Sequence, residues 1–338
     1  MSADRPSSSS VLRSALTAGS AIAGAYAGLA ATRWAYQQTL PPPSALPPAL
    51  DWSTHSLEVP HGRAQLYVRP GTGVPVVLLH SFNAAASSAE MAPIADHLAA
   101  TTDRPLYAVD WLGFGGSDRP DLDYAPDVFG RQLYHVLTDV VDEPADLVAL
   151  SLGCEYAGWM GLQAAPRVRR LALISPTGLT SERGPSMMGR AGLAIAGRTG
   201  VFELLYYRLT RRSSLRDYYE RQVFLDADAV PDALVDYAYT TTHVRGAAHA
   251  PRRFVEGSLF LDTVGPEIYG RLYRPTLLLS PETPGPTVQR FDQLPHLLDQ
   301  NPHALTHKTV PGGLMPHWEA PDAFFEALMP FLSHANDH

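Results

Sequence analysis

The stretch that ends at Ser151 constrains this chain more than any other part of the sequence. Residues 147–150 (Leu-Val-Ala-Leu) are a short apolar run that predicts a buried strand. Ser151 follows the run at once, and the composition of residues 156–162 favours a helix. Two small residues, Ala149 and Gly153, stand two positions before and two positions after the serine, where a sharp turn would press neighbouring backbone against it. A strand, a serine in a tight turn and a helix are together typical of a nucleophile elbow.

Apolar runs alternate with helical patterns on both sides of this stretch. We expect further strands over residues 64–68, 74–80, 106–110, 171–174 and 275–279, and helices over residues 88–100 and 126–141. Strands that alternate with helices of this length predict an α/β protein with a doubly wound, mostly parallel sheet.

Three further motifs occur in a fixed order around the elbow. They are His-Ser-Phe-Asn-Ala at residues 80–84, Asp-Trp-Leu-Gly-Phe-Gly-Gly-Ser-Asp at residues 110–118, and Gly-Gly-Leu-Met-Pro-His-Trp-Glu-Ala-Pro at residues 312–321. With these motifs and the elbow, residues 57–335 resemble the α/β-hydrolase fold superfamily, of the type that contains a cap, apart from a divergent middle. The resemblance implies an α/β-hydrolase fold with an inserted helical cap.

The resemblance also implies a function and a set of site residues. Ser151 would be the nucleophile, and the backbone N–H groups of Phe82 and Leu152 would form the oxyanion hole. The implied activity is that of a serine hydrolase acting on a carboxylic ester or a related small apolar molecule, without a cofactor.

The same resemblance divides the chain into a core and two additions. Residues 51–180 and 272–338 would form the hydrolase core, and residues 181–271 would form the helical cap. Residues 1–50 would be an Ala/Gly-rich helix followed by a proline-rich linker.

The chain departs from the family pattern at two positions of the catalytic triad. The base of the triad normally comes directly after the glycine matched by Gly313, and this chain has Leu314 there. The place of the acid is taken by Pro284. Neither residue can accept a proton, so the triad that activates a serine is degenerate.

Other residues could replace the missing base and acid. His317 lies three positions after Leu314, on the loop that normally carries the base, and Glu282 lies two positions before Pro284. We therefore name Ser151, His317 and Glu282 as the candidate catalytic residues. Four more titratable residues stay open as substitutes or as structural groups: His80, Glu155, His243 and His249.

Loss of the base from a serine triad costs on the order of 10⁶ in turnover. Three classes of function therefore stay open. The first is a serine hydrolase with a displaced base. The second is a protein that binds a small molecule without turnover, and the third is a cofactor-free, lyase-like enzyme that uses the oxyanion hole.

Charge and cysteine content exclude several other classes. The net charge is −8 and no basic tract is present, so nucleic acid is not an expected partner. Cys154 is the only cysteine, which excludes an internal disulfide and a cysteine zinc site. The sequence has no metal-ligand constellation and no dinucleotide-binding glycine motif, so we expect neither a metal nor a cofactor.

The N-terminal segment carries a separate signal. No charged residue occurs between Ser14 and Thr32, a length close to that of a membrane span, but its many Ala and Gly residues make it only weakly hydrophobic. The run is predicted to be a membrane anchor, a signal peptide or a surface helix, so membrane association and a cytoplasmic location both stay open. The prolines at 41–43 and 47–48 predict a stiff linker, so we expect this helix to be detached from the core. Arginines in the predicted cap favour either a solvated face or a face that contacts a membrane: Arg208, Arg211, Arg212, Arg216 and Arg221.

Overall fold

An eight-stranded sheet organises the protein in a computed structural model that describes residues 24, 27–28, 30–180, 201–282 and 289–333. β2 is antiparallel to both of its neighbours, and the six strands from β4 to β8 across the sheet are parallel. This is the α/β-hydrolase fold that the sequence predicts. The order across the sheet is β1 (Ser53–Val59), β2 (Gly62–Arg69), β4 (Leu106–Val109), β3 (Val76–Leu79), β5 (Ala145–Leu150), β6 (Val168–Ile174), β7 (Thr276–Pro281) and β8 (Leu305–Val310).

Helices cover both faces of the sheet, which explains why the central strands consist mainly of apolar residues. All six residues of β5 are buried. Leu147 and Ala149 belong to one apolar core, on the side of α3 (Pro126–His135) and α4 (Gly153–Gln163). Val148 and Leu150 belong to a second core, on the side of α2 (Ala92–Thr101) and α13 (Pro321–Ser333). A parallel strand buried on both faces has a continuous apolar sequence, as residues 147–150 do.

The sequence missed the two edge strands. The seven residues of β1 are exposed or half-buried, and four of the six residues in β8 are polar or charged, so neither strand has a strong apolar pattern. The predicted helix 88–100 is a short 3₁₀ turn, η2 (Ser88–Met91), that leads into α2, and the predicted helix 126–141 is α3 followed by the π-helical η3 (Val136–Val141).

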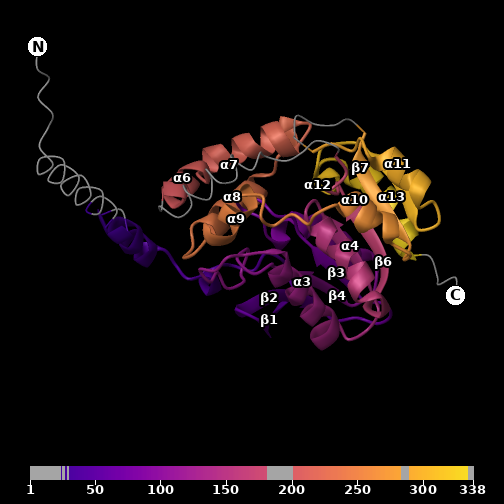
Figure 1. The fold of residues 1–338 in the computed structure, drawn as a ribbon, viewed down its shortest axis with the longest axis horizontal. Coiled ribbons are helices and arrows are strands. Elements are labelled where there is room, and N and C mark those ends of the chain that lie inside the picture. The colour runs from indigo at the N-terminus through magenta and orange to yellow at the C-terminus, as the bar shows by residue number, and fades with distance from the viewer. Residues whose placement is uncertain (1–23, 25–26, 29, 181–200, 283–288, 334–338) are drawn as a thin grey trace, which may run out of the picture.

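Short helices fill the chain between β6 and β7, and we call residues 201–271 the insertion. In Figure 1 its helices α6 to α9 lie together along the upper side of the molecule, while α3 and α4 lie over the strands. The elements of the insertion are α6 (Val201–Leu209), α7 (Arg212–Tyr218), η5 (Tyr219–Val223), η6 (Ala227–Ala229), α8 (Asp232–Thr242), α9 (His249–Val255), α10 (Val264–Glu267) and η7 (Tyr269–Arg271). The remaining elements are η1 (Pro43–Ala45), η4 (Ala165–Arg167), α11 (Leu294–Gln300) and α12 (Pro316–Glu319).

The chain ahead of β1 is docked on the insertion. Residues 30–39 are helical, and we call residues 33–49 the strap. The Nε of Arg33 lies 2.5 Å from Oε2 of Glu203 in α6, and the Gln37 side chain donates a 2.8 Å hydrogen bond to the Tyr207 hydroxyl. The Tyr237 hydroxyl donates to the Pro47 carbonyl at 2.9 Å. The end of the helix nearest the linker is therefore held against the insertion and not detached.

Most of the uncharged run from Ser14 to Thr32 lies outside the described residues. Within the described ranges, no helix is long and apolar enough to cross a bilayer.

Candidate active site

Ser151 sits in a strained turn between β5 and α4. Its φ is +53°, a value that few residues other than glycine adopt and that costs about 1–3 kcal/mol. The Ser151 N–H donates to the Ile174 carbonyl at 2.9 Å, so the turn is fastened to the end of β6. A Cβ at Gly153 would come within 2.6 Å of the His80 carbonyl oxygen, which explains the glycine at that position. The strand, the sharp turn at Ser151 and the helix are therefore arranged as the sequence predicts.

Two backbone N–H groups, one in this turn and one on the loop after β3, have no acceptor among the described residues. Phe82 and Leu152 are both buried, yet neither N–H donates a hydrogen bond to any part of the described chain. Buried N–H groups without partners are rare in folded proteins. They belong to the two loops, after β3 and after β5, that the sequence predicts to form an oxyanion hole.

The loop after β3 is held in place by a buried carboxylate. Glu90 accepts hydrogen bonds from the Ser81 N–H at 2.9 Å and from the Asn83 side-chain amide at 2.8 Å. Burial raises the pKa of Glu90 above its ordinary value. The Phe82 ring packs among other rings, 4.8 Å from Phe129 and 5.2 Å from Tyr156, so the position of the loop is also fixed by packing.

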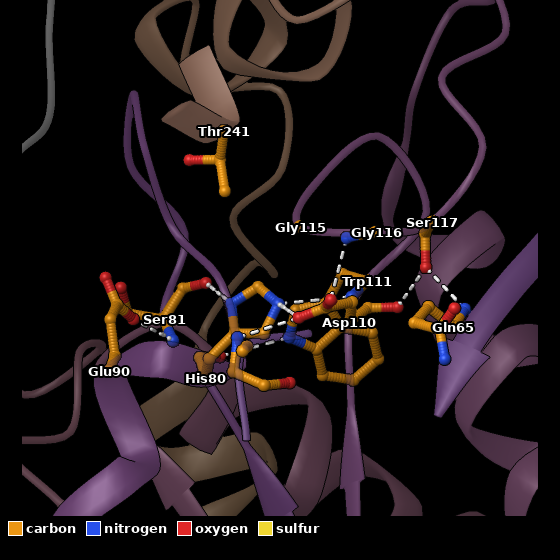
Figure 2. A network of polar contacts seen from close by, with 12 residues as sticks. Gln65, His80, Ser81, Glu90, Asp110, Trp111, Gly115, Gly116, Ser117 and Thr241 are labelled. Carbon is orange, nitrogen blue, oxygen red and sulfur yellow. Dashed lines mark hydrogen bonds and ion pairs between the residues drawn. The ribbon is translucent and has the colours of Figure 1, made fainter. Parts of the chain in front are cut away.

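His80 is part of this support and not a base. Its Nδ1 lies 2.7 Å from the Ser81 carbonyl, and its Nε2 accepts the Trp111 N–H at 3.1 Å. These partners assign the proton to Nδ1 of a neutral ring, and burial lowers the pKa of His80 to about 4. Figure 2 shows the His80 ring between Glu90 and Asp110. The Asp110 carboxylate accepts hydrogen bonds from the N–H groups of Ser88 and Gly116.

His317 is buried and bonded to backbone. Its Nε2 lies 2.7 Å from the Glu90 carbonyl oxygen, which also accepts the Trp318 indole N–H at 2.9 Å. Among the described residues, its Nδ1 has no hydrogen-bond partner. Burial lowers the pKa of His317 to about 4. The structure therefore shows a neutral histidine that joins α12 to η2.

The structure does not bring the three candidate catalytic residues together by hydrogen bonds. Within the described chain, no side chain forms a hydrogen bond with the Ser151 hydroxyl. No hydrogen bond joins His317 to the Glu282 carboxylate. Glu282 is exposed directly after β7, and its N–H donates to the Val310 carbonyl at 3.0 Å. Pro284, in the place of the missing acid, lies outside the described residues. A Ser151–His317–Glu282 triad therefore stays a prediction without a contact to support it.

The loop that carries Leu314 is fastened to the insertion. The Leu314 N–H donates to the Val223 carbonyl at 2.7 Å, and the Gly313 N–H donates to Oε2 of Glu319 at 2.6 Å. The other oxygen of Glu319 accepts the N–H groups of Leu225 at 2.8 Å and Asp226 at 2.6 Å. Sequence reasoning missed this role of Glu319, because all its partners are backbone groups and two of them lie more than 90 positions earlier in the chain.

Glu155 is a buried acid on the elbow helix, beside the candidate site. It accepts hydrogen bonds from the Thr177 hydroxyl at 2.5 Å and from the Leu261 N–H at 2.9 Å. Burial raises its pKa to about 7. These contacts connect α4 to the chain after β6 and to the insertion, which accounts for a charged residue in a helix that is otherwise buried.

The sequence model of one protein family, described as the alpha/beta hydrolase family, matches residues 76–327 of this chain. The chain belongs to the alpha/beta hydrolase family. It is 26% identical over 289 residues to the 2-hydroxy-6-oxo-6-(2'-aminophenyl)hexa-2,4-dienoic acid hydrolase of Metapseudomonas resinovorans, an alignment that covers 80% of this chain and 88% of that protein.

Solved structures of other proteins share the fold. An enol-lactonase from Burkholderia xenovorans aligns with a TM-score of 0.64 at 18% identity, over 83% of this chain and 100% of that one. An esterase from Thermogutta terrifontis aligns with a TM-score of 0.63 at 16% identity, over 83% and 98% of the two chains. A serine hydrolase involved in carbazole degradation aligns with a TM-score of 0.63 at 21% identity, over 83% and 99%.

The histidines of the insertion of this alpha/beta hydrolase have other partners. Nδ1 of His243 lies 2.9 Å from the Tyr239 carbonyl, and Nδ1 of His249 lies 3.1 Å from the Arg119 carbonyl. Neither hydrogen-bonds the Ser151 hydroxyl in the described chain. Neither histidine is therefore placed by a hydrogen bond to act as a base for Ser151.

Two cavities of this alpha/beta hydrolase lie away from the elbow. One, of about 200 Å³, lies between the strap and the insertion and is lined in part by Arg33, Glu203 and His249. The other, of about 510 Å³, lies beside β1 and α2. Ser151 lines neither of these two cavities. The described residues contain no cluster of ligands that could hold a metal ion.

Proposed function

We propose that this member of the alpha/beta hydrolase family is a serine hydrolase of small apolar carboxylic esters that works without a histidine base. The observation that carries the proposal is the strained Ser151 followed by the unpaired amide of Leu152, together with a second unpaired amide, that of Phe82, on the loop after β3. Donors held in place before reaction are the part of a serine hydrolase that stabilises developing negative charge. The names of the structural neighbours, an esterase and an enol-lactonase, support a small carbonyl substrate.

The proposed reaction begins with attack of the Ser151 oxygen on the ester carbonyl carbon. The carbonyl oxygen takes negative charge and accepts the Phe82 and Leu152 N–H groups. Because no side chain hydrogen-bonds the Ser151 hydroxyl in the described chain, water or hydroxide takes its proton. The alkoxide or phenolate then leaves, and water hydrolyses the acyl-serine.

The missing base sets the expected rate. A serine hydrolase stripped of its triad keeps roughly 10³–10⁴ of rate enhancement over water, from the oxyanion hole and binding. The proposal therefore expects slow turnover that favours activated esters, since a good leaving group needs no protonation.

Labelling with a fluorophosphonate, followed by peptide mass spectrometry, tests the proposal. We expect slow covalent labelling at Ser151, none in Ser151→Ala, and unchanged labelling in Ser53→Ala, which replaces an exposed serine on the edge strand β1. The probe concentration and reaction time are chosen so that even a slowly reacting esterase is labelled. If the wild-type protein stays unlabelled under these conditions, Ser151 is not a nucleophile.

Binding without turnover is the second candidate function. It is favoured by Leu314 in the place of the base and by the engagement of His317 with the Glu90 carbonyl. Under this alternative, esters raise the melting temperature of wild-type protein and of Ser151→Ala equally, and no product appears. Under the hydrolase proposal, only Ser151→Ala leaves the ester intact.

A further inference from the structure

The outer face of α6 is apolar where a surface helix is usually polar. Glu203 and Tyr206 point inward and are buried, while Leu205 and Leu209 on the opposite side are 48% and 62% exposed. Residues four apart lie one above the other on a helix, so these two leucines form a stripe. A helix that is apolar on both faces has a second surface to cover.

The helix of residues 30–39 carries an exposed tryptophan. Arg33 pairs with Glu203 of α6, and the Tyr36 ring packs edge-on to the Tyr207 ring at 4.9 Å, so the helix of residues 30–39 lies against α6. Trp34, on the same turn of that helix, is 68% exposed. Tryptophan is the side chain most typical of the boundary between water and acyl chains.

Two arginines border the leucine stripe with their charge uncompensated. Arg208 and Arg211 are exposed, and neither forms an ion pair with any part of the described chain. Arg212, the next residue, differs because it pairs with Asp236 and lies over the Tyr239 ring. The stripe is therefore flanked by positive charge although the whole chain carries a net charge of −8.

The uncharged run from Ser14 to Thr32 leads directly into the helix that lies against α6. Helices that lie in the interface of an anionic membrane typically have leucine and tryptophan on one face and arginine or lysine beside that face.

We propose that the outer face of α6, with Trp34, is a surface that lies on an anionic lipid bilayer. Leu205, Leu209 and Trp34 enter the boundary of the acyl chains, and Arg208 and Arg211 contact the lipid phosphates. The contact is peripheral, and it is separate from any role of the N-terminal run as an anchor.

Flotation of the full-length chain with vesicles tests this surface. The vesicles are phosphatidylcholine alone or phosphatidylcholine mixed with phosphatidylglycerol. We expect Leu205→Gln combined with Leu209→Gln to lower the partition coefficient on mixed vesicles by about tenfold or more. Leu225→Gln combined with Tyr273→Gln is the matched control, since both are exposed apolar residues on other elements, and it should bind like the wild type.

The arginines are tested by the preference for charged lipid. Each basic residue near an anionic surface contributes about fivefold in affinity, so Arg208→Gln with Arg211→Gln should remove most of the preference for mixed vesicles. Brominated acyl chains should quench wild-type fluorescence more than that of Trp34→Phe. Circular dichroism and the melting temperature confirm that each variant folds.

Three results would overturn the proposal. The leucine variant could float as well as the wild type, which would assign binding to the N-terminal run alone. The wild type could fail to float with either vesicle. In the third result, the wild type does not bind vesicles but sediments as a dimer without lipid, and the leucine variant sediments as a monomer. That result would assign the surface to a second copy of this chain.

Discussion

The Nε2 atom of His317 lies 2.7 Å from the carbonyl oxygen of Glu90. The carboxylate of the same Glu90 holds the Ser81 N–H and the Asn83 amide, so one residue connects α12 to the candidate oxyanion loop. His317 therefore stabilises the loop that carries Phe82, and in this geometry it acts as a structural hydrogen-bond donor.

Replacing His317 by Phe should lower stability but leave Ser151-dependent ester turnover within about twofold, because this account assigns no proton transfer to the ring. Loss of one buried hydrogen bond should cost about 1–2 kcal/mol of unfolding free energy. Denaturant unfolding and assays of p-nitrophenyl esters measure the two effects. Trp318→Phe, which removes the second donor to the same carbonyl, is the matched control. A loss of turnover to the level of Ser151→Ala would show that His317 is the base.

The effect of His317→Phe on stability should depend on pH. The pKa of His317 is about 4 in the folded protein, below the usual value near 6.5 in an unfolded chain. The unfolded state therefore binds the proton first, and the stability present above pH ~6.5 is lost as pH falls toward 4. The phenylalanine variant lacks this loss, so its deficit relative to wild type should shrink by about 1–3 kcal/mol over that range. A deficit that is constant with pH would contradict the buried, neutral ring.

The strap should contribute to the stability of the insertion. Arg33→Ala removes the nearer of two cationic partners of the buried Glu203 carboxylate, whose pKa burial already raises; His249 at 3.7 Å remains. We expect a loss of about 2 kcal/mol and faster amide exchange in α6 than in β5. Arg131→Ala, which breaks an exposed pair with Asp127 one helical turn away, should cost less than about 0.5 kcal/mol. Equal effects of the two substitutions would show that the strap does not support α6.

The sequence predicted the parts of the fold whose signal is local. The apolar run before Ser151 and the small Ala149 and Gly153 were enough to predict the elbow, and the alternation of strands and helices predicted the parallel sheet. β1 and β8 escaped detection because edge strands with polar side chains have no distinctive periodicity.

The site was less predictable because its contacts are distant in sequence. His317 looked like a substitute base since it stands on the correct loop, but its partner is a backbone carbonyl 227 positions away. Glu319 is fixed by backbone groups of the insertion, which no side-chain pattern reveals. The loss of the base at Leu314, in contrast, was readable from a single position.

Restoring the family's residues should raise activity. Leu314→His returns a base to the position after Gly313, and Pro284→Asp returns an acid to its place in the pattern. A positioned general base contributes about 10²–10⁴ in rate, so we expect the double variant to hydrolyse p-nitrophenyl butyrate at least tenfold faster than wild type. The same pair in a Ser151→Ala background is the control and should show no gain. An unchanged rate in a folded double variant would show that the serine is not placed for triad chemistry.

The pH dependence of Ser151-dependent turnover tests the central claim most directly. The quantity is kcat/KM for p-nitrophenyl butyrate, wild type minus Ser151→Ala, from about pH 6 to about pH 9. Glu155→Gln is measured in parallel, because the pKa of that buried acid is about 7. Without a histidine base, the logarithm of kcat/KM should rise with a slope of about one across the whole range, as hydroxide takes the proton. A curve that levels off near pH 7, in wild type and in Glu155→Gln alike, would contradict the account by revealing a titrating base beside Ser151.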